Sequence, residues 1–377
     1  MPYLILTPFF PNKSNFVGSY LLDQAKEINK QIDKKVCVVI IENLFSKSQD
    51  YLMEGIQCYV FNKIDFPSFL FPGFFQKYND YRFSKFLKSK NIVLNKDSVV
   101  HGHINYPCAP FLTFLKNKFN CKAILQHHGL DVLQFDTGRI IIFKKLQNKI
   151  IKNRFIKSLN SIDFQIGVSQ KVVNNLINFD SRLANNSYVL YNGVDVNKFY
   201  PLENKSSLFK IGCVANFWEL KDQITLIKAL EVLIENNIID WECEFIGTGP
   251  TKQKCLDYVK RNNMSNITFT NKISHSNLNQ FYNNLDVFVL PSYYEALGCV
   301  YLESWATNTP FIAVKNQGIE ELLDETVKQK YLIDKNDYKS LAKKIIFFKN
   351  NNESITFDTD YNIEKTISNF LLFLKNN

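Results

Sequence analysis

The stretch Asp286–Leu323, DVFVLPSYYEALGCVYLESWATNTPFIAVKNQGIEELL, indicates the fold of the second half of the chain. It opens with a short apolar run, Val287–Leu290, which stops at Pro291 and predicts a buried strand. The segment Gly298–Thr307 has the composition of a helix, and Pro310–Val314 predicts a second apolar strand. The segment Ile319–Leu323 opens another helix.

Two glutamates of this stretch border one candidate anion site. The first turn of a helix has unpaired N–H groups and a dipole that favours negative charge, and Gly298 lets a ligand approach the backbone closely. Glu295 lies in the loop and Glu303 on the helix, and Glu303 should lean back toward the site. Carboxylates accept hydrogen bonds from hydroxyl groups, so the pattern predicts a polyol joined to a phosphate. The alternative is a pair of solvated glutamates at an ordinary helix start.

Glu295-Ala296-Leu297-Gly298 followed by Glu303 resembles the E-x7-E motif of the family 4 glycosyltransferases, also called glycosyl transferases group 1. The resemblance implies an α/β protein of the GT-B fold, in which two Rossmann-like doubly wound domains face each other across a cleft. It also implies that the first glutamate lies by the donor sugar and the second binds the nucleotide ribose. The amides around Leu297 and Gly298 should then meet the donor diphosphate.

Length and composition fit a cytoplasmic protein with two domains. The 377 residues are enough for two cores, and 46% of them are apolar. The eight cysteines are scattered without a C-x-x-C pair, which is typical of buried thiols in a reducing cytosol. No apolar run approaches the length of a membrane span, and Met1–Asn12 lacks the basic region of a signal peptide, so we expect a cytoplasmic protein.

The two halves of the chain differ in charge. Residues 1–190 hold 25 Lys and Arg against 13 Asp and Glu, whereas residues 191–377 hold 20 against 23. The basic half should therefore face something anionic, which could be a membrane surface, a phosphate-bearing acceptor or nucleic acid.

Two segments of the basic half are candidates for contact with an anionic membrane, at the inner face of the cell membrane. Residues 66–90 mix aromatic side chains with lysines, which suits either a membrane interface or a helix whose aromatic face is core. We favour core for the second half of this segment. Residues 139–160 hold seven basic side chains and no acid, which predicts either a membrane-surface helix or a solvated helix face. No recognition motif for nucleic acid accompanies them, so we expect no nucleic-acid partner.

The start of the chain has the pattern strand, proline-containing loop, glycine, helix. Tyr3–Thr7 predicts the strand, Ser19–Asn29 predicts the helix, and Gly18 precedes the helix. The family has a glycine near this helix N-terminus that packs against the donor diphosphate, and Gly18 matches its position. The alternative is a glycine that the turn itself requires.

Two strand ends in the first half carry histidines. Val99–His103 predicts a strand, and the loop after the following strand contains His128 and Asp131. Ligands of doubly wound sheets bind beyond the carboxyl ends of the strands. The loop resembles the family's H-G-x-D motif, whose histidine lies near the reacting sugar, and the resemblance assigns His103 and Asp131 to the acceptor side. The alternatives are a polar strand end for His103 and a structural histidine for His128.

Val189–Phe199, VLYNGVDVNKF, resembles the linker between the two domains of the family, and its Asn-Gly pair is also a turn signal. We therefore expect a Rossmann-like acceptor-binding domain over residues 1–195 and a nucleotide-sugar donor domain over residues 196–361. The last helix, within residues 362–377, should pack back on the first domain, as is usual for the fold.

The donor domain resembles the family at three further turns. Lys221 matches the lysine of a cationic pair that grips the donor diphosphate, whereas Asn216 replaces the usual arginine and keeps a hydrogen-bond donor without the charge. Gly247 lies in a glycine turn that borders the nucleotide, and Lys272-Ile273 aligns with the segment whose backbone meets the base. We therefore expect Lys221 to provide the main electrostatic contribution.

The resemblance implies a retaining glycosyltransferase that needs neither metal nor cofactor and transfers a sugar from a UDP- or GDP-linked donor. The acceptor would be a saccharide or a lipid-linked sugar of surface polysaccharide or glycan biosynthesis. Glu295 would orient the donor sugar, Lys221 and Gly18 would stabilise the leaving diphosphate, and His128 would position the reacting groups. Two rivals stay open: a GT-B nucleotide-sugar epimerase, and a catalytically silent nucleotide-binding subunit of a glycosylation complex.

Overall fold

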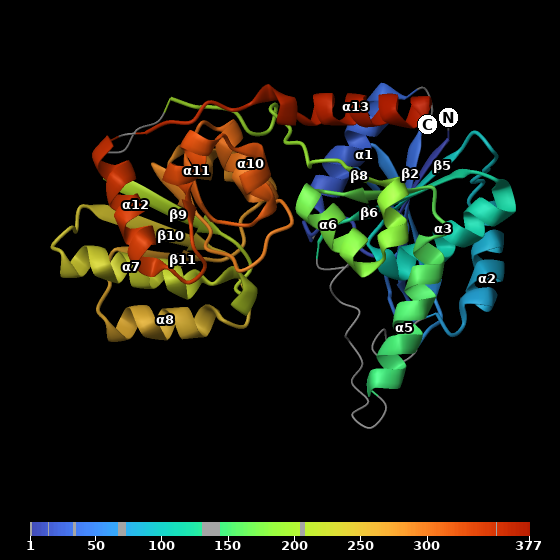
Figure 1. The fold of residues 1–377 in the computed structure, drawn as a ribbon, viewed down its shortest axis with the longest axis horizontal. Coiled ribbons are helices and arrows are strands. Elements are labelled where there is room, and N and C mark those ends of the chain that lie inside the picture. Colours follow the sequence, from blue (N-terminus) through green and yellow to red (C-terminus); the bar gives the residue numbers. More distant parts are fainter. Residues whose placement is uncertain are drawn as a thin grey trace. The chain divides into compact units, whose positions relative to one another are not determined.

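The computed structural model describes residues 2–13, 15–32, 35–66, 73–129, 144–203, 208–351 and 353–377 (Figure 1). The chain forms two compact units, each built on a mainly parallel sheet. Unit 1 comprises Met1–Tyr191 with Thr366–Asn377, and unit 2 comprises Asn192–Lys365. The predicted α/β class is confirmed. None of the helices in the described ranges combines the length and apolar character that a membrane span needs.

Unit 1 contains, within the described residues, an eight-stranded sheet of order β3-β4-β2-β1-β5-β6-β7-β8. The short β3 pairs antiparallel with β4, and the other neighbours pair parallel. Every residue of β1 and β5 is buried, as expected for parallel strands covered on both faces. The strands are β1 (Tyr3–Thr7), β2 (Val36–Asn43), β3 (Tyr51–Met53), β4 (Ile56–Lys63), β5 (Val99–His103), β6 (Lys122–His127), β7 (Phe164–Gly167) and β8 (Ser187–Val189).

The helices of unit 1 pack apolar faces against this sheet. In the first helix Leu21, Ala25 and Ile28 are buried at helical spacing. The helices are α1 (Ser19–Gln31), α2 (Gln76–Ser89), α3 (Asn105–Phe119), α5 (Lys144–Leu159) and α6 (Gln170–Phe179), followed by the 3-10 turn η2 (Ser181–Asn186).

The last helix, α13 (Ile363–Asn376), contributes its residues from Thr366 onward to unit 1. The Lys122 Nζ atom donates a hydrogen bond of 2.7 Å to the Leu374 carbonyl, and the Phe373 ring lies 5.2 Å from the Phe164 ring. The C-terminal end of the chain is thereby attached to the sheet of unit 1.

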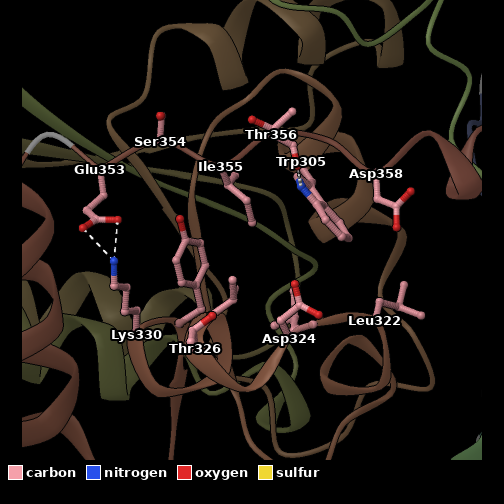
Figure 2. A pocket seen from close by; sticks show the side chains of 13 residues that line it. Trp305, Leu322, Asp324, Thr326, Lys330, Glu353, Ser354, Ile355, Thr356 and Asp358 are labelled. Atoms are coloured by element: carbon pink, nitrogen blue, oxygen red, sulfur yellow. Dashed lines mark hydrogen bonds and ion pairs between the residues drawn. The ribbon is translucent and has the colours of Figure 1, made fainter.

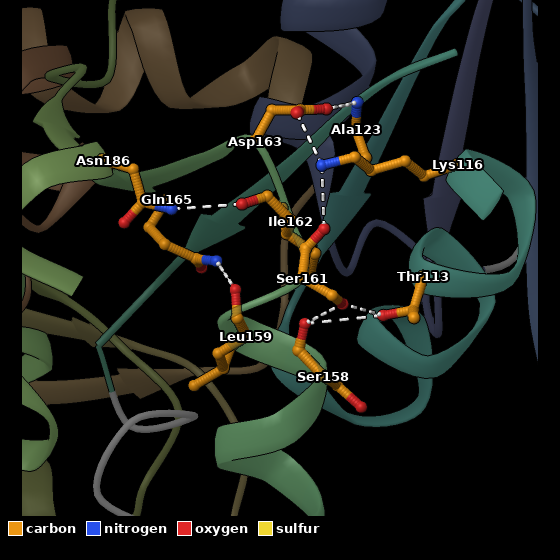
Figure 3. A network of polar contacts seen from close by, with 10 residues as sticks. All are labelled: Thr113, Lys116, Ala123, Ser158, Leu159, Ser161, Ile162, Asp163, Gln165 and Asn186. Atoms are coloured by element: carbon orange, nitrogen blue, oxygen red, sulfur yellow. Dashed lines mark hydrogen bonds and ion pairs between the residues drawn. The ribbon is translucent and has the colours of Figure 1, made fainter. Parts of the chain in front are cut away.

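A polar network fixes α5 against α3 beside the amino-terminal ends of β6 and β7 (Figure 3). Thr113 Oγ1 on α3 and Ser161 Oγ, just after α5, lie 2.7 Å apart. Lys116 Nζ pairs with Asp163 Oδ1 at 2.6 Å, and the other oxygen of Asp163 accepts a hydrogen bond of 2.8 Å from the Ala123 amide. These contacts hold the C-terminal end of α5 in one position on α3.

The preference for a buried aromatic face in the second half of residues 66–90 is wrong for two of its tyrosines. Tyr78 and Tyr81 are 53% and 57% exposed, whereas Asn79, Phe83 and Leu87 are buried. The buried residues recur every four positions, and the buried amide of Asn79 caps the end of β4 through two bonds to Ile64. Of the two basic segments, residues 67–72 and 139–143 lie outside the described ranges.

Unit 2 contains, in its described part, a six-stranded parallel sheet of order β11-β10-β9-β12-β13-β14. The strand order reverses between β9 and β12, which is the point where ligands bind in open α/β sheets. The two strands predicted in Asp286–Leu323 are confirmed as β12 and β13, and the helix between them as α10. The strands are β9 (Phe209–Val214), β10 (Trp241–Ile246), β11 (Ile267–Thr270), β12 (Val287–Val289), β13 (Phe311–Val314) and β14 (Leu332–Ile333).

In the described part of unit 2, five α-helices and three 3-10 turns connect these strands, and α12 and η6 follow the last strand. The helices are α7 (Gln223–Glu235), α8 (Lys252–Arg261), α9 (Leu278–Asn283), α10 (Cys299–Ala306), α11 (Glu325–Tyr331) and α12 (Tyr338–Asn351). The turns are η3 (Glu219–Lys221), η4 (His275–Asn277), η5 (Gly318–Leu322) and η6 (Thr359–Tyr361). All eight cysteines are free thiols, six of them buried, as predicted; Cys37 and Cys299 are partly exposed.

Candidate functional site

The structure brings Lys221 and Glu295 together in unit 2, although 74 residues separate them in sequence. Lys221 ends η3, after β9, and Glu295 lies in the loop after β12, so both belong to the two strands at which the sheet order reverses. The Lys221 Nζ atom donates to Glu295 Oε1 at 2.5 Å. A cation and a carboxylate thus lie where this kind of sheet binds ligands.

Glu295 is held in one orientation by two further hydrogen bonds, one of them to a glutamine that is itself anchored. Its Oε1 atom also accepts a hydrogen bond of 2.6 Å from Ser292 Oγ, and its amide donates one of 2.5 Å to Gln317 Oε1. Gln317 in turn donates from Nε2 to the Tyr293 carbonyl at 3.0 Å. Only 9% of Glu295 is exposed. The sequence argument missed Ser292 and Gln317, because a serine and a glutamine in loops have no distinctive spacing.

The loop that carries Glu295 packs tightly on the loop after β13. A Cβ atom added at Gly318 would lie 1.7 Å from the Ala296 carbonyl oxygen, and the Gly318 amide donates to the Glu295 carbonyl at 3.3 Å. Any side chain at Gly318 would therefore displace the backbone that positions Glu295.

Gly298 and Leu297 connect Glu295 to α10. Gly298 precedes the helix with φ at +80°, and a Cβ atom there would lie 2.7 Å from the Tyr301 ring and 3.6 Å from Glu295 Cγ. Leu297 is fully buried and anchors the turn. The first turn of α10 therefore begins directly beside the Glu295 side chain, as the motif predicts.

Glu303, on α10, is 8% exposed and accepts hydrogen bonds from two side chains. Tyr282 Oη on α9 donates at 2.9 Å, and His275 Nε2 on η4 lies 3.3 Å from the other carboxylate oxygen. Burial, together with the Glu303 charge, raises the pKa of Tyr282 well above its ordinary value, so this phenol remains a donor. The sequence argument did not identify Tyr282 or His275.

The glycine turn after β10 has a backbone requirement of its own. Gly247 has φ at +149°, and a Cβ atom there would lie 2.0 Å from the Ala215 carbonyl oxygen. Lys252 Nζ donates to the Gly247 carbonyl at 3.1 Å and to the Thr270 carbonyl at 3.2 Å. Gly247 is therefore explained by packing, and its role beside a nucleotide remains a prediction.

The remaining predicted donor residues lie at the ends of the neighbouring strands. Asn216 follows β9 with an exposed side chain, and its carbonyl accepts a hydrogen bond of 3.1 Å from Gln223 Nε2. Lys272 and Ile273 follow β11, where Lys272 is exposed and Ile273 is half-buried. The structure does not by itself explain a role for the Lys272 side chain.

In unit 1, His103 and His128 meet at the ends of β5 and β6. His103 Nδ1 lies 3.0 Å from His128 Nε2, and the His101 and His103 rings stack with centroids 4.4 Å apart. Tyr3 Oη shares a hydrogen bond of 2.8 Å with His101 Nδ1, and the Tyr20 ring lies 5.2 Å from the His128 ring. The structure joins His103 and His128, which were predicted separately, in a cluster of three histidines and two tyrosines.

This histidine cluster is uncharged in its interior. Burial lowers the pKa of His101 to about 3 and holds the pKa of His103 well below its ordinary value, and the neighbouring histidines lower both further. A neutral His103 can keep His128 in one orientation without adding charge.

Gly18 precedes α1 with φ at +87°, and a Cβ atom there would lie 2.9 Å from the Phe9 ring, so the turn itself requires a glycine. Asp131, predicted on the acceptor side, lies outside the described residues. Among the described residues, no group of three His, Cys, Asp or Glu side chains could hold a metal ion.

A cavity of 390 Å³ lies elsewhere in unit 2, between α10, α11 and residues 353–358 (Figure 2). Trp305 Nε1 donates to the Thr356 carbonyl at 2.8 Å, and Lys330 pairs with both carboxylate oxygens of Glu353, at 2.9 and 3.0 Å. Its described lining includes neither Lys221 nor a residue of the loop that carries Glu295. We assign this cavity no part in the candidate site.

Two family descriptions match the chain in succession. Glycosyltransferase Family 4 matches residues 25–198, and Glycosyl transferases group 1 matches residues 198–362. The change from one to the other falls in the linker Val189–Phe199, close to the start of unit 2.

Three curated relatives are similar over parts of their lengths. An uncharacterized glycosyltransferase of Methanocaldococcus jannaschii is 30% identical over 70% of this chain and 69% of its own. The capsular polysaccharide biosynthesis glycosyltransferase CapM of Staphylococcus aureus is 26% identical over 62% and 57%. The UDP-Gal:alpha-D-GlcNAc-diphosphoundecaprenol alpha-1,3-galactosyltransferase of Escherichia coli is 27% identical over 42% and 44%.

Solved structures share the fold over the whole chain. Sucrose-phosphate synthase of Thermosynechococcus elongatus has a TM-score of 0.75 at 15% identity and covers 100% of this chain and 99% of its own. The Anabaena protein HepE in complex with UDP has a TM-score of 0.70 at 15% identity and covers both chains completely. At this identity the likeness shows the fold, and it confirms the predicted GT-B class.

Proposed function

Since the chain belongs to the family 4, group 1 glycosyl transferases, we propose that it transfers a sugar from a nucleotide donor to an acceptor with retention of configuration. The observation that supports this best is the pairing of Lys221 with Glu295 at the point where the strand order of unit 2 reverses. The loop that carries Glu295 is fixed by hydrogen bonds to Ser292 and Gln317. A silent relative of the fold would have no need to keep a partly exposed cation paired with a buried carboxylate.

Lys221 would stabilise the charge of the leaving diphosphate. As the bond between sugar and phosphate breaks, negative charge grows on the phosphate oxygens, and a cation already in place costs little reorganisation. The side chain of Lys221 is 25% exposed and is held by Glu295, so it can reach a ligand without searching for its position. The first-turn amides of α10 beside Gly298 would add to this stabilisation.

Glu295 and Glu303 would bind hydroxyl groups of the donor. Each carboxylate has more acceptor positions than its described partners use, and Glu295 lies directly against the start of α10. Glu295 would orient the sugar, and Glu303, on the side of α9 and η4, would bind the ribose. The acceptor hydroxyl would give its proton to the leaving phosphate, with His128 holding the reacting groups in position.

The donor would be a UDP- or GDP-linked sugar, used without metal or cofactor. UDP is bound in the related HepE structure, which supports a uridine nucleotide. The Escherichia coli relative is named for a lipid diphosphate acceptor and CapM for capsular polysaccharide synthesis. They support a saccharide or lipid-linked acceptor in surface polysaccharide synthesis, with the protein in the cytoplasm or peripheral at the inner face of the membrane.

The test is thermal stabilisation by a panel of nucleotides and nucleotide sugars, with and without EDTA. A ligand at a hundred times its Kd stabilises the native state by about 2.7 kcal/mol, which raises the Tm of a domain of this size by about 5–10 °C. We expect one nucleotide to act selectively, in EDTA as well, and Glu303→Gln to reduce the shift by about half at the same ligand concentration. The control Glu235→Gln, at an exposed position of α7, should keep it. No shift by any nucleotide would contradict the proposal.

Product analysis separates the two rivals. Donor consumed only in the presence of acceptor supports transfer, whereas donor converted without acceptor identifies an epimerase. Nucleotide binding without turnover across a panel of acceptors would identify a silent subunit, which the exposed Asn216 in place of the family's arginine would then explain.

A further inference from the structure

A cavity of 610 Å³ lies in unit 1 between α2, α3 and α5, and the donor and histidine residues described above do not account for it. Its volume falls within the range of about 300–1,000 Å³ that is typical of small-molecule sites. Aromatic rings from the three helices and from the residues just before α2 form its walls. They are Phe74 and Phe75 before α2, Tyr78 on α2, Tyr106 on α3 and Phe155 on α5.

The aromatic wall remains largely exposed. Phe74 is 59% and Tyr78 is 53% exposed, and the neighbouring Phe66 is 40% exposed. The rings of Phe66 and Phe75 each lie within 5.4 Å of Phe74, centroid to centroid, at steep interplanar angles. An exposed aromatic cluster beside a cavity marks a binding surface for an apolar group.

The rim of the same cavity is cationic. Lys77, Arg154 and Lys157 line it, and no acidic side chain is among its described lining residues. Residues 144–159 of α5, KKLQNKIIKNRFIKSL, continue this charge with six basic residues and no acid. An occupant that matches this surface combines an apolar part with negative charge.

The walls are fixed without a ligand. The Tyr106 and Phe155 rings meet edge to face at 5.9 Å, and the network of Figure 3 holds the end of α5 against α3. Tyr106 Oη accepts a hydrogen bond of 2.7 Å from Lys63 Nζ and donates to Asp65. The polar atom of this tyrosine is therefore satisfied, and its ring is available as apolar wall.

We propose that this cavity binds a phosphate-bearing amphiphile, with its apolar chain on the aromatic wall and its phosphate at the cationic rim. Tyr106 lies at the start of α3, which follows the strand end that carries His103, so the cavity belongs to the same unit as the predicted acceptor residues. The amphiphile would be the lipid part of a lipid-linked acceptor, and this identification rests on the proposed transferase function.

The geometry favours a lipid over single-stranded nucleic acid. Bases bind by stacking on open aromatic faces, whereas the Phe66 and Phe74 rings are inclined by 63° and the Phe74 and Phe75 rings by 79°. Rings packed edge to face on one another present a rough apolar surface that suits a flexible chain.

The experiment is calorimetric titration of the full chain with dodecyl phosphate below its micelle concentration. Two controls are titrated in parallel. Inorganic phosphate has the negative charge without the apolar chain, and dodecyl maltoside has the chain without the charge. We expect dodecyl phosphate to bind at least about tenfold tighter than either, because chain burial and charge add. Equal binding of inorganic phosphate would reduce the cavity to an anion site, and equal binding of the maltoside would remove the role of charge; either result overturns the proposal.

Matched variants locate the site. The double substitution Lys77→Glu and Lys157→Glu should weaken the binding of dodecyl phosphate about thirtyfold, because each substitution removes the contribution of one lysine. The control pair Lys88→Glu with Lys96→Glu changes the net charge equally at exposed positions of unit 1 outside the cavity. Phe74→Ser should weaken binding, and Phe45→Ser, at a 91% exposed phenylalanine, should not. Equal losses in the controls would overturn the assignment to this cavity.

Flotation with vesicles extends the test to membranes. Vesicles of phosphatidylcholine mixed with phosphatidylglycerol should bind the protein, and pure phosphatidylcholine should not. A single-stranded oligonucleotide is the competing ligand. If it displaces dodecyl phosphate and the same variants abolish its binding, the ligand of the cavity is nucleic acid and not a lipid. These measurements need neither donor nor turnover. If the protein transfers sugar but does not bind amphiphiles, only this proposal is wrong. If it binds amphiphiles but does not transfer sugar, only the proposed function is wrong.

Discussion

The two units place opposite kinds of chemistry at the carboxyl ends of similar sheets. Unit 2 holds a charged pair, Lys221 with Glu295, at 2.5 Å, whereas unit 1 holds a cluster of buried histidines without charge in its interior. A charged pair can respond to a diphosphate that gains negative charge, and a neutral cluster can orient hydroxyl groups without competing for that charge. Under the proposed function, unit 2 would contribute electrostatic stabilisation and unit 1 would contribute position.

The largest effect should follow removal of the cation from the charged pair. Lys221→Met should lower the transfer rate about 10²–10³-fold, the range for loss of one preorganised charge-stabilising group. Steady-state assays with saturating donor measure this loss, and Lys260→Met, at an exposed position near the end of α8, is the control. A rate like that of the wild type would remove the distinction between the two units.

The neutral cluster should appear as acid sensitivity of unit 1. Because the pKa of His101 is about 3 in the folded state and 6.5 when unfolded, the unfolded chain binds more protons between these values. The neutral His101 side chain contributes fully to the free energy of unfolding above pH 6.5, and this contribution is lost as the pH falls toward 3. We expect the free energy of unfolding to be about 2 kcal/mol lower at pH 5 than at pH 7.

Denaturant unfolding at pH 7 and pH 5, followed by hydrogen exchange in each unit, measures this. Unit 1 should lose more stability than unit 2, and His101→Gln should reduce the difference. A loss that is equal in both units would contradict the neutral cluster as its cause.

Within unit 2, the two donors to Glu303 allow a finer test. Glu303→Gln should weaken nucleotide binding about tenfold, because it removes the ionised acceptor of ribose hydroxyls. Tyr282→Phe should weaken it only a few-fold, since Glu303 keeps His275 as a partner. Calorimetric titration with the nucleotide that gives the thermal shift compares the two. The reverse order would make Tyr282, rather than the carboxylate, the group that binds the ligand.

The smallest effect should come from restoring the family's missing cation. Asn216→Arg places a charge at an exposed position after β9, and an exposed charge contributes about 0.2–1 kcal/mol. We expect donor affinity to rise about two- to fivefold, less at high salt. A large gain in turnover would mean that the natural chain has low activity because it lacks this arginine. That result would favour the alternative of a catalytically silent subunit.

The sequence predicted backbone elements better than the surroundings of the site. Short apolar runs such as Val287–Leu290 and Pro310–Val314 became strands because a buried parallel strand needs little more than a continuous apolar stretch. The short β3 was missed, since Tyr51–Met53 has no such pattern.

The partners of the site residues could not be predicted, because tertiary packing chooses them. Gln317 supports the Glu295 amide from 22 residues away, and Tyr282 reaches Glu303 from a different helix. The family motif predicts which glutamates matter, but the identity of their donors is set by how α9, α10 and the loop after β13 meet. The α2 tyrosines were misjudged for a similar reason: the buried stripe includes Asn79, whose amide meets its partner Ile64 only in the folded chain.

Cys299, partly exposed, gives the protein a natural chemical reporter. It is the first residue of α10, directly after Gly298, and its Sγ atom accepts a hydrogen bond of 3.4 Å from Asn192 Nδ2. Burial raises the pKa of the other partly exposed thiol, Cys37, to about 12, so almost none of it is thiolate at neutral pH. An alkylating reagent should therefore modify Cys299 first, and the rate of that labelling would report occupancy of the neighbouring site in the unmodified chain, without an engineered probe.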